Sequence, residues 1–225
     1  MTVLGVQNLY TNQIDKLSKG EYSSGGLYIA LDEFLNLQLS GQEQVSNIDT
    51  LNSIIKQYKT SKKSAKAKLR RYYDEFNDET FYYASCHPVY DRWKSYILPV
   101  IRSSKYGDSM FIRWCYTSED PLFISRAEVK CDGETKDFIY QRFNSDVERG
   151  RFIEWFNDYQ TKEGLMKQIS CSKKTIVRFH GSQYYDDLVV PSIDKQGIKD
   201  VLNAYDSCVE KIHSFEDRYK QIKNL

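Results

Sequence analysis

Apolar residues recur at intervals of three and four positions over two long stretches, a spacing that predicts amphipathic helices. The first stretch covers 45–76 and weakens at 61–64, so we expect one long helix or two with a solvated middle. The second stretch begins near Pro191 and continues to the C-terminus, which predicts one long closing helix. A shorter apolar run at 27–35 indicates a further helix, started by the turn residues before it and ended near Gly41.

Short aromatic and β-branched runs, which favour strands, occupy the region between the two helical stretches. They are 81–83, 110–116, 122–124, 127–131, 136–140, 152–156, 175–180 and 184–190. Asp132-Gly133 lies between two of these runs and supplies the positive φ angles of a tight hairpin turn. The segment 165–170 predicts a short helix between strands.

The order of helices, then strands, then a helix predicts an α+β protein rather than alternating βα units. We expect an antiparallel β-sandwich-like domain with N-terminal helices and a long C-terminal helix. The expected parts are a helical region at 1–78, the sandwich-like domain at 79–190 and the closing helix at 191–225. That helix would pack either on the N-terminal helices or on a second subunit.

Composition narrows the class of protein but does not identify an activity. The chain has 225 residues, 40% hydrophobic and 28% charged, with a formal net charge of +1, which is ordinary for a globular protein and argues against a wholly basic surface. Its 18 Tyr and 11 Phe are too many for a disordered chain. Adjacent tyrosines in a strand point to opposite faces, so we expect each Tyr-Tyr pair to serve both core and rim.

Targeting signals and cysteine usage bear on location. No apolar run is long enough to span a membrane, and Met1–Lys19 lacks the pattern of a signal peptide. The five cysteines are scattered and contain no Cys-x-x-Cys pair, which favours free, mostly buried thiols in a reducing compartment. The chain as it stands therefore suggests a cytoplasmic location, and an extracytoplasmic one if a tether preceded it.

The stretch 69–208 resembles an uncharacterised bacterial domain family whose members often follow a lipoprotein signal or a transmembrane segment. The most specific shared motif is the run 172–187, SKKTIVRFHGSQYYDD, and it is followed by a helix at 200–205. Weaker motifs in the same order are 80–83, 120–124, 129–134 and 152–155. The resemblance implies a β-sandwich-like domain followed by a helix, with no known activity. This chain departs from the family in lacking the tether and in its longer final helix.

Polar side chains concentrate at one predicted hairpin, which makes it a candidate ligand-binding rim. Its candidate residues are Arg178, His180, Gln183, Tyr184, Tyr185, Asp186 and Asp187. Arg178 and His180 would share one strand face, and Asp186 or Asp187 would return beside Arg178. Arg178 would then be either a bidentate anion donor or one half of a structural ion pair.

Enzymatic alternatives use Cys86 with His87, or His180 with Asp187, as in hydrolases. Adjacent residues of an extended segment diverge, and no Gly-x-Ser-x-Gly motif accompanies the second pair. The three histidines and five cysteines lack zinc-ligand spacing. We therefore expect a non-enzymatic binding or structural module without metal or cofactor, with a hydrolase as the alternative.

Basic residues crowd the segment 56–71, which contains no acid. On a helix, a continuous stripe would comprise Lys56, Lys59, Lys63, Lys66 and Arg70. Such a stripe could bind nucleic acid, an anionic membrane surface or an acidic protein, or be a solvated helix face. A protein partner or self-association through the long helices is the other expected interaction. Self-association would bury the apolar residues Ile212, Phe215, Tyr219 and Ile222.

Overall fold

The computed structural model describes residues 3–19, 24–37, 43–140, 143–160 and 163–223. Its helices are α1 (Val3–Ser18), α2 (Ser24–Asn36), α3 (Glu43–Lys66), α4 (Glu163–Cys171), α5 (Ser192–Ala204) and α6 (Val209–Lys223), with a short 3-10 helix η1 (Asp91–Trp93). Its strands are β1 (Arg70–Asp74), β2 (Glu79–Tyr83), β3 (Tyr96–Ser104), β4 (Gly107–Ser118), β5 (Arg126–Cys131), β6 (Glu134–Tyr140), β7 (Asn144–Glu148), β8 (Arg151–Asp158), β9 (Thr175–His180) and β10 (Tyr185–Val189). The α+β class expected from the sequence is confirmed.

The chain forms two compact units, a helical unit from 1–64 and 206–225 and a β-rich unit from 65–205. These boundaries differ from the expected divisions 1–78, 79–190 and 191–225. The difference arises because the first strand begins at Arg70 and because α5 contacts β3 of the β-rich unit. The C-terminal helix is accordingly divided between the two units.

The core of the helical unit combines α1, α2, α3 and α6. Its most deeply buried side chains include Leu17, Leu27, Leu31, Phe34, Leu51, Ile55, Ile212 and Phe215. The rings of Phe34 and Phe215 meet edge to face with 4.9 Å between centroids. Arg218 donates to the carbonyl oxygens of Leu35 and Leu37, which satisfies backbone acceptors at the end of α2. The apolar face of α6 is therefore occupied within its own chain, so Ile212 and Phe215 are not available for self-association.

The C-terminal helical pattern is interrupted between α5 and α6, at 205–208. The Asp206 carboxylate accepts a hydrogen bond from the backbone N–H of Cys208 at 3.0 Å and so caps the start of α6. Before the break, Ile198 and Val201 are buried in the β-rich unit, whereas Ile212 is buried in the helical unit. A single helical spacing of apolar residues therefore contributes to two separate cores, and the sequence pattern does not show where one ends and the other begins.

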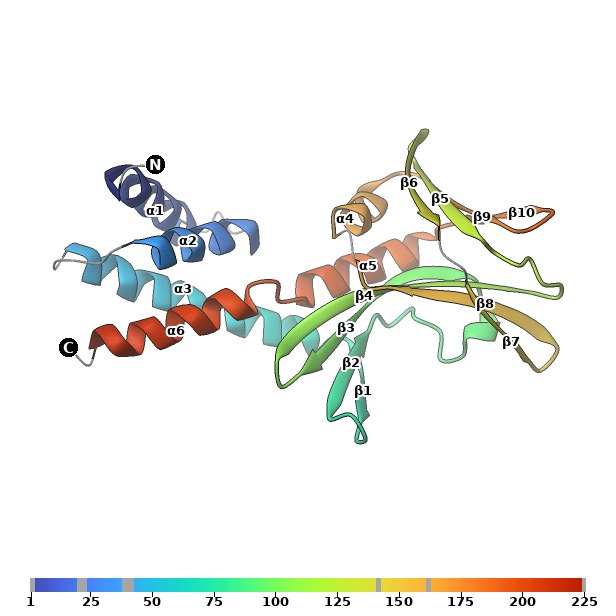
Figure 1. Ribbon diagram of the computed structural model, residues 1–225, viewed down its shortest axis with the longest axis horizontal. Helices are drawn as coiled ribbons and strands as arrows, with labels where there is room; N and C mark the ends of the chain where they lie inside the picture. Colours follow the sequence, from blue (N-terminus) through green and yellow to red (C-terminus); the bar gives the residue numbers. More distant parts are fainter. Residues whose placement is uncertain (1–2, 20–23, 38–42, 141–142, 161–162, 224–225) are drawn as a thin grey trace. The chain divides into compact units, whose positions relative to one another are not determined.

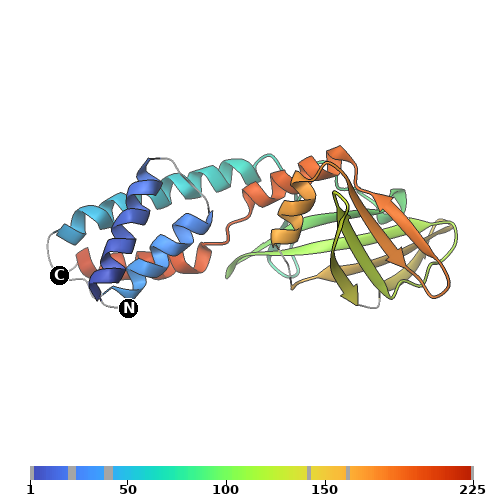
Figure 2. The same ribbon diagram turned by 90° about the horizontal axis from the view of Figure 1, so that it is seen from above.

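Two antiparallel sheets form the β-rich unit. The larger has the order β1-β2-β3-β4-β8-β7 and the smaller has the order β10-β9-β5-β6. Figures 1 and 2 show the smaller sheet, α4 and α5 on the same side of the larger sheet, a layered arrangement resembling a sandwich. Buried residues of both sheets and of α5 meet between the layers, among them Ile112, Trp114, Val129, Val177, Phe179 and Ile198. Among the described residues, no further strands cover the other side of the larger sheet, where η1 contacts β4 and β8.

Most of the strands expected from the sequence are present. Asp132 and Gly133 adopt φ values of 50° and 95° in the turn between β5 and β6, as the Asp-Gly prediction required. The expected helix at 165–170 is α4. The residues of β9 alternate between buried and half-buried, which confirms that Arg178 and His180 share the outer face.

Several expectations were wrong. Residues 70–74 form the edge strand β1 instead of continuing a helix, which ends at Lys66. The run 122–124 is a loop rather than a strand. Strands β3 and β7 and helix α1 were not anticipated, and Gly41 lies outside the described residues.

The expectation of core and rim roles for adjacent tyrosines is also wrong at the sheet edges. Tyr72 and Tyr73 are 58% and 45% exposed, and Tyr184 and Tyr185 are 75% and 58% exposed. Strands β1 and β10 lie at the edges of their sheets, and their tyrosines stay in solvent although Leu188 of β10 packs against the core. These tyrosines belong to the surface.

Candidate functional site

The β9–β10 hairpin brings together the residues that the sequence analysis selected. Arg178 and Asp187 lie opposite each other in the register, and Arg178 donates from Nε and NH2 to the two carboxylate oxygens at 2.7 and 2.8 Å. The guanidinium carbon also lies 3.9 Å from the centre of the Tyr185 ring. The hydrogen bond from Arg178 lowers the pKa of the Asp187 carboxyl. Arg178 is thus engaged by its own hairpin, as the structural interpretation predicted.

His180 and Asp186 of the same hairpin have partners as well. His180 Nε2 lies 3.2 Å from a carboxylate oxygen of Glu128, and Arg126 lies 3.4 Å from the other Glu128 oxygen. Asp186 accepts a hydrogen bond from the hydroxyl of Tyr116 at 3.0 Å. Gln183 and Tyr184 are exposed in the turn. These contacts tie β10, β9 and β5 together and explain the motif as a device that fixes sheet register.

The glycine of the same motif is required by a close backbone approach. A Cβ atom on Gly181 would lie 2.0 Å from the carbonyl oxygen of Leu122. That carbonyl accepts from the N–H of Ser182 at 3.2 Å. The buried Glu154 carboxylate accepts from the N–H groups of three successive residues, Leu122, Phe123 and Ile124, at 2.6, 2.9 and 2.7 Å. The loop therefore cannot withdraw from Gly181, and it forms no strand because Glu154 takes its N–H groups.

Neither hydrolase pair is assembled. The ring of His180 contacts Glu128 and Arg126 and not Asp187, and Ser182 lies exposed in the turn. The Cys86 thiol packs where Gly197 leaves room, and burial raises its pKa to about 11. A thiol with that pKa is a poor nucleophile at neutral pH.

His87 has surroundings different from those of Cys86. Its ring lies edge-on between Tyr83 and Tyr96, with 4.8 Å between centroids in both cases. Burial lowers its pKa to about 4, so the imidazole is neutral at neutral pH. Nδ1 lies 2.9 Å from the carbonyl oxygen of Pro88, which can only accept, so the proton belongs on Nδ1. His87 is thus a structural residue of an aromatic cluster.

The basic residues do not form one helix stripe. Lys56, Lys59 and Lys63 belong to the helical unit, whereas Lys66 and Arg70 belong to the β-rich unit. Lys59 pairs with Glu216 at 2.7 Å, and Lys66 pairs with Asp108. Arg70 lies on β1, where its guanidinium is 5.4 Å from the centre of the Tyr83 ring. A five-residue helical stripe for phosphates is therefore not present.

The outer face of the larger sheet presents a set of aromatic side chains that the sequence analysis did not combine. We call this set the aromatic face: Tyr72, Phe81, Tyr83, Phe111 and Trp155. The register places Tyr72 beside Phe81, and Tyr83 in line with Val100 and Phe111. Residues opposed in antiparallel strands point to the same face, so these rings share one side.

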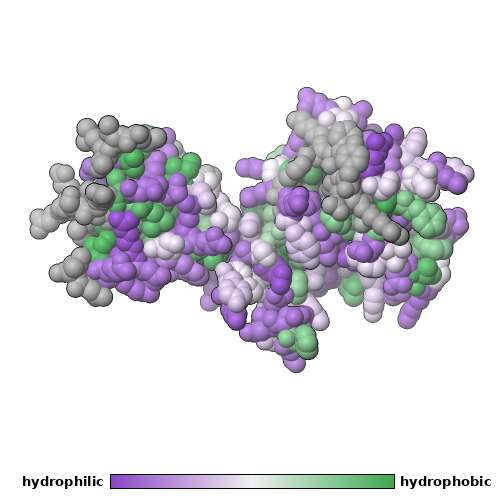
Figure 3. Space-filling view, in the orientation of Figure 1, coloured by the Kyte–Doolittle hydropathy of each residue, from purple (hydrophilic) through white to green (hydrophobic). Residues whose placement is uncertain are grey.

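Three rings of the aromatic face contact one another, whereas Phe111 contacts Tyr159 and Trp155 lies beside Arg113. The rings of Tyr72 and Phe81, and those of Phe81 and Tyr83, have centroids 6.4 Å apart, and the second pair is nearly parallel at 27°. Tyr72 is exposed, Phe81, Tyr83 and Trp155 are half-buried, and Phe111 is buried. Half-buried rings keep a fixed position while still offering apolar surface to a ligand. Figure 3 shows a further apolar patch at the tip of the β1–β2 hairpin, where Phe76 is 95% exposed.

The arginines beside the aromatic face are held by carboxylates. Arg113 lies 5.1 Å from the Trp155 ring centre and donates to Asp91 and, at 3.1 Å, to Asn157. Burial disfavours the charged guanidinium, but the hydrogen bond to Asp91 outweighs this and raises the pKa of Arg113. Asp91 also accepts from the Tyr96 hydroxyl at 2.5 Å. This end of the face is therefore polar and close to neutral.

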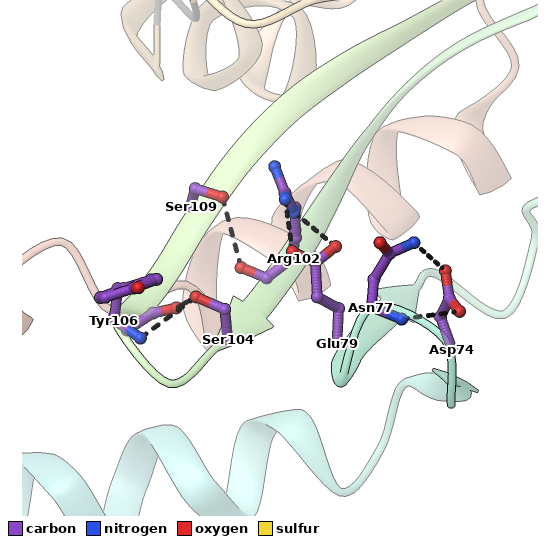
Figure 4. A network of polar contacts seen from close by, with 8 residues as sticks. Asp74, Asn77, Glu79, Arg102, Ser104, Tyr106 and Ser109 are labelled. Carbon is purple, nitrogen blue, oxygen red and sulfur yellow. Dashed lines mark hydrogen bonds and ion pairs between the residues drawn. The ribbon is translucent and has the colours of Figure 1, made fainter.

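The other end of the aromatic face is fixed by contacts near two hairpin turns. Arg102 on β3 pairs with Glu79 on β2, with 2.7 Å between Nε and Oε2 (Figure 4). The hydroxyl of Ser109 on β4 donates to the Arg102 carbonyl oxygen at 3.4 Å. Again the guanidinium is paired with a carboxylate, whereas Arg70, over the Tyr83 ring, donates to the carbonyl oxygen of Pro88 at 3.5 Å.

Comparison with known proteins identifies no relative. No family model matches the chain, and neither a curated protein nor a solved structure is similar to it. In the described part, no group of three or more His, Cys, Asp or Glu side chains is placed to hold a metal ion. No helix in that part is both long and apolar enough to cross a membrane. All five cysteines are free thiols, and three of them are buried.

Proposed function

We propose that the protein is a non-enzymatic recognition module that binds an uncharged oligosaccharide on the aromatic face. One observation carries this proposal. Aromatic rings, most of them partly exposed and all held in place by the strand register, lie on a sheet face where Arg102 and Arg113 are paired with acids and Arg70 lies over the Tyr83 ring. The hairpin at 175–190 and the long helices, which were the expected recognition elements, are occupied by contacts within the chain.

The chemistry of the aromatic face suits a sugar. Sugar rings carry C–H groups on their faces and hydroxyl groups around their edges. Aromatic rings accept the C–H faces, while planar polar groups such as those of Asn157 and Arg113 can hydrogen-bond the hydroxyls. A few placed polar groups among apolar ones are the usual composition of a small-ligand site.

A nucleic-acid ligand fits the same face less well. Stacking sites for single strands combine aromatic rings with a positively charged groove that follows the phosphates. Here Arg92, Arg102 and Arg113 pair with Glu148, Glu79 and Asp91, so a phosphate would have to displace a carboxylate at each of these three arginines. Displacing such a partner costs the energy of a charge-assisted hydrogen bond.

A titration with cellohexaose, maltohexaose and chitohexaose tests the proposal, with tryptophan fluorescence and calorimetry as readouts. Trp155 lies in the site, so saturable binding of at least one sugar should change its emission. Tyr72→Ala should weaken binding about tenfold, because one stacking surface is lost. Tyr185→Ala is the matched control, since Tyr185 is 58% exposed like Tyr72 but lies on the smaller sheet.

Two results would overturn the assignment. The first is the absence of saturable binding to all three sugars at millimolar concentration. The second is tighter, salt-dependent binding of oligo-dT, which would make the aromatic face a nucleic-acid site instead.

A further inference from the structure

Strand β1 is an open edge of the larger sheet. Among the described residues it pairs with β2 on one side and with no strand on the other. Four of its five residues are exposed, including Tyr72 and Tyr73. An open edge presents unpaired backbone N–H and C=O groups, which can pair with a strand from another chain.

The charges of β1 are separated along the strand. Arg70 and Arg71 begin it and Asp74 ends it. Across the hairpin these residues face Tyr83, Tyr82 and Glu79, so no ion pair forms between β1 and β2 at these positions. Asp74 lies opposite Glu79, which carries the same charge.

The Asp74 carboxylate keeps its charge at neutral pH. The Asn77 side chain donates to it at 2.9 Å, and this hydrogen bond lowers the pKa of the carboxyl (Figure 4). The backbone N–H groups of Phe76 and Asn77 donate to its other oxygen. A fixed negative charge therefore lies at one end of β1, and the positive charges of Arg70 and Arg71 lie at the other.

We propose that two copies of the chain pair their β1 strands antiparallel, about a two-fold axis at Tyr72. This register sets Arg70 of each copy opposite Asp74 of the other, and Arg71 opposite Tyr73. The two Tyr72 rings meet at the axis. Opposed residues in antiparallel strands point to the same face, so both Arg–Asp pairs can form.

The arrangement of charges makes this pairing selective. Charged residues on an edge strand normally discourage association, because an arbitrary partner leaves them unmatched. A second β1 in antiparallel orientation is the partner that matches basic and acidic ends at both positions. The two aromatic faces then become continuous, since Tyr72 is the outermost ring of each.

The contact is small, so we expect a weak dimer. Five residue pairs bury less than the area of a standard stable interface. Sedimentation equilibrium from micromolar to about 1 mM should show reversible, concentration-dependent dimerisation. A chain that stays monomeric over this range overturns the proposal.

Cysteine cross-linking tests the axis. In a Cys171→Ser background, which removes the exposed thiol, Tyr72→Cys should form a covalent dimer under mild oxidation. The residue at the axis meets its own copy at a Cα separation of about 4.5 to 5.5 Å, which a disulfide can span. Tyr73→Cys, one residue away, should not cross-link, because its copy lies roughly 7 Å further along the strand. Equal cross-linking of both variants, of neither, or of Tyr73→Cys alone contradicts the register.

Charge exchange tests the partner. Arg70→Glu should weaken homodimerisation at least about tenfold, because it sets two acids opposite each other. Asp74→Arg should do the same, and a mixture of the two variants should form a heterodimer. Lys130→Glu is the control, since it changes an exposed cation on the smaller sheet by the same charge.

Asp74 also supports its turn, so the fold of Asp74→Arg must be verified by circular dichroism. Asp74→Asn keeps an acceptor oxygen for the backbone N–H groups of Phe76 and Asn77 and removes the charge and the acceptor of the Asn77 side chain, so it should weaken the dimer without unfolding the hairpin. A dimer of unchanged strength in Arg70→Glu or in Asp74→Asn overturns the proposal. None of these measurements uses a sugar, so they stand apart from the test of ligand binding.

Discussion

The two hairpins β1–β2 and β9–β10 have similar side chains but arrange them differently. Each has an exposed edge strand with tyrosine and aspartate, and each hairpin also carries arginine, on the edge strand itself in β1 and on the inner strand β9 in the other. In β9–β10 the opposite charges of Arg178 and Asp187 lie across from each other and form a bidentate pair. In β1–β2 they lie at the two ends of one strand and face uncharged or like-charged residues. Charges placed across a hairpin stabilise it, whereas charges placed along its edge remain for a partner.

Gly181→Ala should have the largest effect, because it destabilises the β9–β10 hairpin. The new Cβ would lie 2.0 Å from the Leu122 carbonyl oxygen, a backbone atom in a loop held by Glu154. We expect a loss of about 3 kcal/mol or more in the free energy of unfolding, measured by denaturant titration. Gly164→Ala is the control, because nothing lies within 4 Å of its Cβ position in α4. Equal stability of both variants would contradict the close approach.

Acid should weaken the region around β1–β2 through His87. Burial lowers its pKa from 6.5 to about 4, so between these values the unfolded chain binds a proton that the folded chain does not. The free energy of unfolding should therefore fall as the pH drops from 6.5 to 4, by about 3 kcal/mol in total. His87→Phe should flatten this part of the stability curve, and His213→Gln, at an exposed position, should not. A curve with the same slope in His87→Phe would assign the acid sensitivity to another group.

Arg178→Met should cause a smaller loss, seen as a modest fall in the thermal midpoint. The Arg178–Asp187 pair is more than a third exposed on both sides, so solvent screens it. Arg71→Met on β1 is the direct comparison and should leave the midpoint unchanged, because its cross-strand neighbour is Tyr82. Similar losses in the two variants would remove the distinction between the hairpins.

Phe76→Ser should have the smallest effect on stability. The side chain is 95% exposed at the tip of β1–β2, so its removal takes away almost no buried surface. Thermal unfolding should be unchanged within error. A clear fall in the thermal midpoint would show that Phe76 is packed in solution and that the tip of the hairpin is not exposed.

Sequence patterns predicted the elements whose burial alternates or follows a helical period. The strand 175–180 is buried on one face only, and its alternation gave both the strand and the shared face of Arg178 and His180. Strand β1 gave no such signal, because an edge strand with both faces in solvent has no core side to mark. The spacing of Leu69, Tyr72 and Phe76 fitted a helix by coincidence.

Strand β3 escaped prediction for the opposite reason, because its first six residues are buried on both faces. Tyr96 through Ile101 are all buried, so no polar position alternates with them, and Pro99 within the run argues against a strand. The structure accommodates the proline because β2 pairs with β3 only from Val100 onward. The aromatic face could not be predicted from the sequence either, because only the registers of β2, β3 and β4 bring Tyr83 into line with Phe111.

The division of the helical unit has a consequence for how the chain is made. Helices α1 to α3 are synthesised before the β-rich unit, but their core is completed by α6, which follows that unit in the sequence. Until then Leu51 and Ile55 lack the side chains of Ile212 and Phe215 that share their core. The β-rich unit in between is complete in sequence by Tyr205 and can fold while the earlier helices wait. The β-rich unit can therefore complete its core before the helical unit does, although α1 to α3 are synthesised earlier.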